Sequence, residues 1–130
     1  MKFSNKQIDR YSRQIILKKI GTIGQKKLLK SSVLIVGAGG LGSPIAIYLA
    51  ASGIGKIGII DKDNVEISNL TRQIIFSTND IKKQKSSIAI SKLKKINPDI
   101  KLQSFSKKLT IKNINKIAKN FDLIVDGSDN

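Results

Sequence analysis

A glycine-rich turn at residues 37–42 is the first part of this chain whose residue types suit a specific chemistry. The apolar run 33–36 leads directly into the pattern G-x-G-x-x-G, which predicts a buried strand, a tight turn and the start of a helix. Gly37 permits the turn, Gly39 lets the backbone approach a ligand, and Gly42 lets the helix pack on the strand. Backbone N–H groups and the helix dipole then face an anion, so the turn predicts phosphate binding.

An acidic residue stands at the distance that a nucleotide site requires. Asp61 lies nineteen residues after Gly42, at the end of a second apolar run, 57–60. A carboxylate at the end of this second strand can hold ribose hydroxyls. The turn, the strand and the spaced acid together predict adenine-nucleotide binding.

The segment after Asp61 does not suit an ordinary dehydrogenase. A polar connection over 63–78 replaces the expected quick return to a helix, and a helical pattern opens only near Lys85. Arginine offers a fork for phosphate oxygens, lysine offers a point charge, and carboxylates hold magnesium. The segment after Asp61 supplies such groups at Asp63, Asn69, Arg72, Gln73 and Lys85. Together they favour attack at a nucleotide phosphate over hydride transfer.

Four further motifs accompany the glycine turn and Lys85: Arg10-Tyr11-Ser12-Arg13-Gln14, Asp61-x-Asp63 with Ser68-Asn69-Leu70-x-Arg72-Gln73, Ile96-Asn97-Pro98, and Asp126-Gly127-Ser128-Asp129-Asn130. With these motifs the chain resembles the HesA/MoeB/ThiF family, the bacterial relatives of the ubiquitin-activating enzymes. The resemblance covers nearly the whole sequence in order. Lys82 departs from the pattern, because relatives usually carry a glycine there.

The resemblance implies ATP-dependent adenylation of the C-terminal glycine carboxylate of a ubiquitin-like sulfur-carrier protein. It implies that Gly40 contacts the nucleotide, that Asn69, Arg72 and Lys85 bind the phosphates, and that Asp129 binds Mg²⁺. Arg13 matches an arginine that reaches across a homodimer into the partner's site, where it would stabilise the leaving pyrophosphate. We therefore expect ATP and Mg²⁺ as cofactors, and Arg13, Arg72, Lys85 and Asp129 as catalytic residues.

Other interpretations stay open at the level of sequence. Taken singly, Arg10, Arg13 and Lys85 are also consistent with solvated charges on helix surfaces. A related transfer-RNA-modifying dehydratase, which adenylates its substrate, is an alternative enzyme. A non-catalytic nucleotide-binding fragment is a third.

The elements alternate between helix and strand. Ser4 and Gln7 form a capping-box pattern that predicts a helix to about residue 18, ended by Gly21, and a short helix over 25–30. Strands are expected at 33–36, 57–60, 100–105 and 121–125, and helices at 44–52 and 84–96. A further helix is expected behind Thr110, marked by Ile111, Ile114, Ile117 and Ala118. We expect N-terminal helices over 1–30 and a Rossmann-like, open, mainly parallel α/β sheet over 31–130, with the domain itself incomplete.

Composition limits the remaining choices. The chain has 130 residues, 40% of them hydrophobic, and a net charge of +15. Lysines are scattered through every segment and no nucleic-acid-binding motif appears, so nucleic acid is not the expected partner. No membrane span or signal peptide is seen, and no cysteine is present, which favours a cytoplasmic protein without thioester chemistry in this part. The family resemblance places any zinc site in a C-terminal part beyond residue 130.

Overall fold

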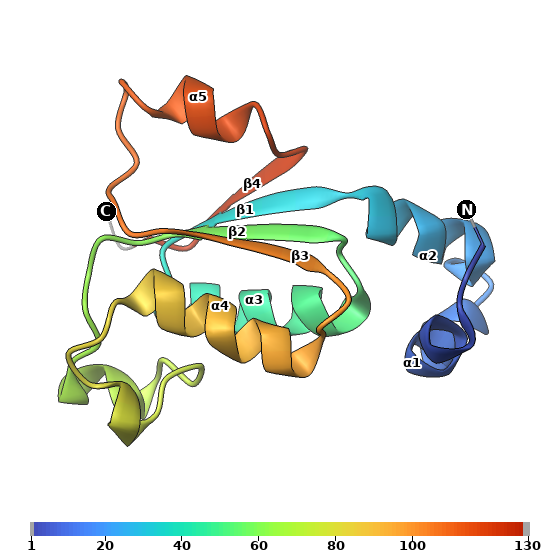
Figure 1. The fold of residues 1–130 in the computed structure, drawn as a ribbon, viewed down its shortest axis with the longest axis horizontal. Coiled ribbons are helices and arrows are strands. Elements are labelled where there is room, and N and C mark those ends of the chain that lie inside the picture. The colour runs from blue at the N-terminus through green and yellow to red at the C-terminus, as the bar shows by residue number, and fades with distance from the viewer. Residues whose placement is uncertain (1, 129–130) are drawn as a thin grey trace.

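The computed structural model describes residues 2–128 and is built on one parallel sheet (Figure 1). Its strands are β1 (Ser32–Val36), β2 (Lys56–Ile60), β3 (Lys101–Phe105) and β4 (Leu123–Asp126), in the spatial order β3-β2-β1-β4. All three neighbouring pairs run parallel. The predicted open, Rossmann-like α/β architecture is therefore confirmed.

Helices cover both faces of the sheet. Helices α3 (Gly42–Ser52) and α4 (Lys85–Ile96) lie on one face, and the short α5 (Ile114–Ala118) lies on the other (Figure 1). The larger core fills the α3/α4 side with aliphatic side chains such as Ile35, Ile57 and Leu93. A smaller core around Leu34 and Phe121 lies beneath α5. Among residues 2–128, no helix combines the length and the apolar character that crossing a bilayer requires.

Two helices precede the sheet, and one expectation about them is wrong. Helix α1 (Asn5–Ile15) starts with the predicted capping box of Ser4 and Gln7. Gly21 was expected to end this helix, but it begins α2 (Gly21–Lys30) instead. The chain leaves α1 at Ile16 through a series of turns, and Gly21 supplies the positive φ of 59° with which α2 begins.

The helix expected behind Thr110 is shorter than its apolar pattern indicated. Ile114, Ile117 and Ala118 lie in α5 as expected, but Ile111, the first residue of the same apolar pattern, lies before the helix and is 94% exposed. The side chain of Asn113 accepts from the N–H of Thr110 at 2.7 Å and donates to the carbonyl of Lys108 at 2.9 Å. These local bonds hold residues 108–113 in a turn, so the helix begins only at Ile114.

The polar connection between β2 and α4 contains two short 3₁₀ helices, at Ile67–Thr71 and Thr78–Asp80. Lys82, which stands where relatives usually carry a glycine, has φ of 74°. Glycine adopts this left-handed conformation without strain, whereas a lysine there is strained. The backbone geometry thus explains why a glycine suits this position.

Candidate active site

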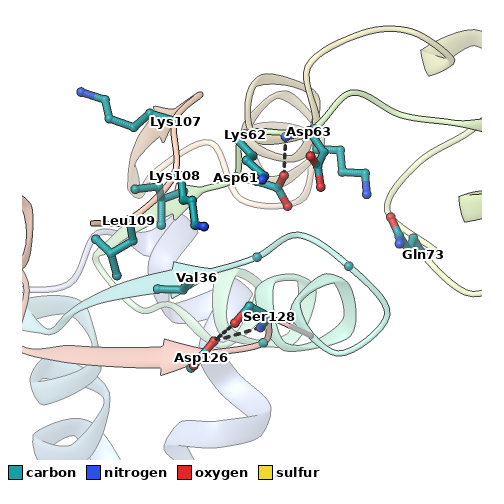
Figure 2. Close-up of a pocket in the computed structure, with 15 residues that line it drawn as sticks. Val36, Asp61, Lys62, Asp63, Gln73, Lys107, Lys108, Leu109, Asp126 and Ser128 are labelled. Atoms are coloured by element: carbon teal, nitrogen blue, oxygen red, sulfur yellow. Dashed lines mark hydrogen bonds between the residues drawn. The ribbon is translucent and has the colours of Figure 1, made fainter. Parts of the chain in front are cut away.

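A pocket lies at the carboxyl ends of the strands, next to the point where the strand order changes direction between β1 and β4. Ligands of open α/β sheets bind at such switch points. The pocket has a volume of about 300 Å³, the lower end of the range for small-molecule sites. Its lining comes from the glycine turn and from the segments that follow β2, β3 and β4 (Figure 2). Six of the residues predicted from sequence line it: Gly37, Gly39, Asp61, Asp63, Gln73 and Lys85.

Two glycines of the turn disfavour a side chain, Gly42 by a steric clash and Gly37 by its backbone conformation. A Cβ at Gly42 would lie 1.9 Å from the carbonyl oxygen of Gly37. Gly37 itself has φ of 91°, and a Cβ there would lie 3.2 Å from the backbone of Gly127 and Ser128. The predicted roles of these two glycines, in the turn and in close packing at the helix start, therefore match the observed geometry.

Asp61 connects the glycine turn to the end of β2. One carboxylate oxygen accepts from the N–H of Ala38 at 2.8 Å, and the other accepts from the N–H of Asp63 at 2.8 Å. Since each carboxylate oxygen has a second lone pair, these bonds leave acceptor capacity for a ligand. Asp61 thus has a visible structural role in addition to the ribose-binding role that the sequence predicts.

Lys85 and Gln73 place buried polar groups against the pocket. Lys85 is the first residue of α4, is 7% exposed, and donates its backbone N–H to the carbonyl of Asp63 at 3.0 Å. Gln73 is 5% exposed, and its side-chain oxygen is buried without a hydrogen-bond partner among the described residues. Because buried polar atoms normally have partners, this amide is poised to meet a bound group.

The remaining phosphate-binding candidates lie outside the pocket lining. Arg72 is exposed, and its guanidinium donates to the carbonyl of Ser68 at 3.2 Å. It passes beside Gly40, where a Cβ would lie 3.7 Å from Cγ of Arg72. Asn69 is buried, and its side chain accepts from the N–H of Glu66 at 2.8 Å, which shapes the connection.

Several lining residues were not predicted as site residues. They follow strands β3 and β4 or lie beside the predicted positions: Val36, Ile60, Lys62, Lys107, Lys108, Leu109, Asp126, Gly127 and Ser128. The rule that ligands bind beyond the carboxyl ends of parallel strands could have found most of them. The hydroxyl and N–H of Ser128 donate to Asp126 and lower the pKa of this exposed carboxyl (Figure 2).

The N-terminal motif around Arg13 lies at the other end of the sheet. Helix α1 sits beyond the amino ends of the strands, whereas the pocket lies at their carboxyl ends (Figure 1). Tyr11 is 1% exposed and belongs to the core. Gln14 donates to Gln25 at 2.6 Å and to the carbonyl of Ser52 at 2.9 Å. Arg13 is exposed on the same helix.

The metal prediction rests on a residue that the structure does not describe. Asp129, the predicted Mg²⁺ ligand, lies outside residues 2–128. Within that range, no three acidic side chains gather closely enough to hold a metal ion by themselves.

The fold is a Rossmann-like α/β fold with a pocket at the switch point of its sheet, and the comparisons with known proteins specify its family. The model of the ThiF family matches residues 11–130. The chain belongs to the ThiF family, as the motifs in its sequence predicted.

Two curated relatives that the chain matches are named adenylyltransferases. The sulfur carrier protein adenylyltransferase of Thermus thermophilus is 42% identical over 130 residues, which are 100% of this chain and 48% of the relative. The probable molybdopterin-synthase adenylyltransferase of Porphyra purpurea is 51% identical over 98% of this chain and 34% of the relative. The chain thus spans about a third to a half of the length of these relatives.

Solved structures give the same fold. A complex of MccB from Escherichia coli with ATP is 35% identical and matches with a TM-score of 0.75, over 81% of this chain and 31% of that one. The tRNA N6-threonylcarbamoyladenosine dehydratase TcdA of Escherichia coli, in complex with ATP, matches with a TM-score of 0.91 over 100% of this chain and 53% of that one. At 24% identity, the second likeness shows the fold alone.

Proposed function

We propose that this chain is the ATP-binding part of an adenylyltransferase that activates the C-terminal glycine carboxylate of a ubiquitin-like sulfur carrier. One observation carries the proposal: a pocket in a ThiF-family chain joins the glycine turn, Asp61 and the buried Lys85 at the switch point of a parallel sheet. The names of the curated relatives support the same activity. The sheet over 31–130 would form the ATP pocket, and the helices over 1–30 would contribute Arg13 to the pocket of a second copy.

The pocket suggests how ATP would lie. The glycine turn would face the phosphates, and Gly40 with Arg72 beside it would lie at their outer edge. Asp61 would hold the ribose. The apolar side chains of Val36, Ile60 and Leu109, which line the same pocket, would contact the base.

The reaction then requires positioning and charge stabilisation. A carboxylate oxygen of the carrier would attack the α-phosphorus of ATP, and the bond from this phosphorus to the bridging oxygen would break. Pyrophosphate would leave with the electron pair, and an acyl-adenylate would remain. No general base is needed, because the carboxylate is already ionised at pH 7. Lys85 and Arg72 would stabilise the negative charge that builds on the phosphate oxygens.

The described carboxylates fit a magnesium ion that binds together with the nucleotide. Asp63 and Asp126 offer oxygen ligands at the pocket, and protein sites commonly hold Mg²⁺ through one or two carboxylates, phosphates and water. The ion would neutralise phosphate charge. Asp129, three residues after Asp126, remains the ligand proposed from the family resemblance.

Arg13 supports a homodimeric site. Arg13 belongs to α1, and this helix lies beyond the amino ends of the strands (Figure 1). Since a five-residue strand spans about 16 Å, we infer that Arg13 does not reach the pocket of its own chain. An exposed arginine in that position would act on the pocket of a second copy. Cytoplasmic location likewise stays a prediction.

Carrier-dependent exchange of labelled pyrophosphate into ATP tests the proposal. The protein produced from its complete reading frame should catalyse this exchange with a ubiquitin-like carrier that ends in glycine. A carrier lacking that glycine is the matched control and should support no exchange. Exchange that depends on transfer RNA would indicate the dehydratase instead. ATP binding without any exchange would indicate a non-catalytic nucleotide-binding protein.

A further inference from the structure

Two lysines lie side by side on the face of the sheet that α5 covers. Lys56 of β2 pairs in register with Lys101 of β3. Side chains alternate along a strand, and Gly58, two residues after Lys56, lies beneath Phe121 of the α5-side core. Phe105, four residues after Lys101, packs edge-on against Phe121 at 6.4 Å between ring centroids. Both lysines therefore belong to this face.

Like charges that face each other across two strands destabilise a sheet. The ammonium group of Lys56 is partly accommodated, since it donates to the carbonyl of Asn120 at 3.2 Å and lies 4.6 Å from the ring centroid of Phe121. Lys101 is exposed. The two ion pairs found within residues 2–128, Arg10 with Asp99 and Lys92 with Asp80, involve neither lysine.

The surrounding sequence strengthens this charge. Residues 101–121 contain six lysines and no acidic residue, and all six lysines are exposed. We call the part of this surface around α5 the basic face; its lysines are Lys56, Lys101, Lys107, Lys112, Lys116 and Lys119.

The basic face contains an open groove of about 230 Å³ between β3 and α5. Phe105 and Ile117 supply apolar lining, and amide side chains with Lys107 and Lys116 supply polar lining. Lys107 also borders the nucleotide pocket, so the two depressions adjoin. In Figure 2, the end of Lys107 points away from the other labelled side chains of that pocket.

We propose that the basic face binds the carrier protein and that it pairs with acidic side chains on the surface of that partner. The inference rests on the proposed function, and it names the surface that would bring the carrier to the nucleotide pocket. Carboxylates of the partner would pair with the lysines, and apolar side chains would meet Phe105 and the 94% exposed Ile111. Single-stranded nucleic acid fits less well, because its bases stack on exposed aromatic rings, whereas Phe121 is buried and Phe105 packs against it.

The test neutralises three lysines of the basic face that do not line the nucleotide pocket: Lys101→Gln, Lys112→Gln and Lys116→Gln in one protein. Removing Lys101 also removes the like-charge pair with Lys56, so we expect no loss of folding stability. The matched control, Lys27→Gln, Lys94→Gln and Lys95→Gln, has the same change in net charge on α2 and α4. Helix α4 lies on the opposite face of the sheet (Figure 1).

We expect the KM for the carrier to rise at least tenfold in the basic-face variant, with kcat and the KM for ATP unchanged. The control should keep the wild-type KM. Added KCl should weaken carrier binding less in the variant than in wild type, because fewer charge pairs remain to be screened. An unchanged carrier KM in the folded variant overturns the proposal.

Direct binding separates this inference from the proposed function. Calorimetry of the carrier with both variants in the absence of ATP measures the contact alone. Carrier binding that depends on the basic face, without any pyrophosphate exchange, would support the surface and contradict the activity. If the wild-type protein catalyses exchange and the basic-face variant binds the carrier normally, the activity is supported and the proposed surface is contradicted. Loss of affinity for transfer RNA with unchanged affinity for the carrier would overturn the choice of a protein partner.

Discussion

The side-chain amide of Asn97 donates a hydrogen bond of 2.8 Å to the hydroxyl oxygen of Tyr11, 86 residues earlier in the chain. The same amide donates to the carbonyl of Ala50 at 2.9 Å. Both side chains are buried, with exposures of 0% for Asn97 and 1% for Tyr11. One amide therefore fixes α1, the helix that carries Arg13, against the ends of α3 and α4.

Asn97→Ala should lower the free energy of unfolding by about 1–3 kcal/mol, because it leaves the buried carbonyl of Ala50 without this donor. Chemical denaturation measures the change. The exposed Asn115→Ala is the control and should alter stability by less than about 0.5 kcal/mol. Equal effects of the two substitutions on the free energy of unfolding would show that the hydrogen bonds of Asn97 between α1 and α4 do not stabilise the fold.

Asp61→Ala should weaken ATP binding by about 1–3 kcal/mol through lost charge-assisted hydrogen bonds to the ribose. Since Asp61 also holds the N–H of Ala38, part of any loss would reflect a disturbed turn. Calorimetry with ATP and with 2′,3′-dideoxy-ATP separates the two effects, as in a double-mutant cycle. The substitution should cost less affinity for the dideoxy nucleotide. The same loss for both nucleotides would refute the contact with the ribose.

Lys85→Ala and Arg72→Ala should each slow carrier-dependent adenylate formation by about a hundredfold or more, as when a preorganised charge stabiliser is lost. ATP affinity should fall less than turnover. Single-turnover kinetics and nucleotide binding provide the two measurements. Equal losses in both would mean that these residues bind ATP without favouring the transition state.

Mixing inactive subunits tests whether Arg13 acts on a second copy. Arg13→Ala and Asp129→Ala proteins, each inactive alone, should regain exchange activity together, because one site of the mixed dimer then has both residues intact. The control mixes each variant with itself after the same denaturation and refolding. Mixed dimers that form and stay inactive would leave Arg13 as a surface arginine worth about 0–1 kcal/mol.

Asp80 gives a pH-dependent contribution to stability. Burial by itself would raise the pKa of Asp80, but hydrogen bonds from the N–H and hydroxyl of Ser77, with the ammonium of Lys92 at 3.4 Å, lower it below the usual value. A lowered pKa in the folded state stabilises the fold above the unfolded-state pKa of about 3.9. That stabilisation is lost as the pH falls through the folded-state pKa.

We therefore expect Asp80→Asn to be less stable than wild type at pH 7, and the difference to shrink below pH ~4. Thermal unfolding across this pH range measures it. The exposed Asp9→Asn serves as the control and should show little difference at any pH. A difference that grows on acidification would show that the Asp80 carboxylate destabilises the fold.

The sequence alone determined the four strands, most of the helices and the glycine-rich turn of this protein, because these features depend mainly on local physics. Apolar runs of four or five residues mark β1 and β2 wherever the rest of the chain lies. Glycines at positions 37 and 42 indicate by themselves a positive φ and a close backbone approach, and the structure has both. The departure of Lys82 from a family pattern that favours glycine also pointed to an unusual backbone conformation at this position, which has φ of 74°.

Tertiary structure decided which of these residues meet. Asp61 and Gly37 line one pocket with Lys108 and Ser128 only because parallel strands bring their carboxyl ends to one edge. Ile111 has the apolar character of a core residue, but local hydrogen bonds before α5 leave it exposed. The register of β2 against β3, which sets Lys56 beside Lys101, comes from packing between segments far apart in the chain. The residue pattern within either strand does not determine this register.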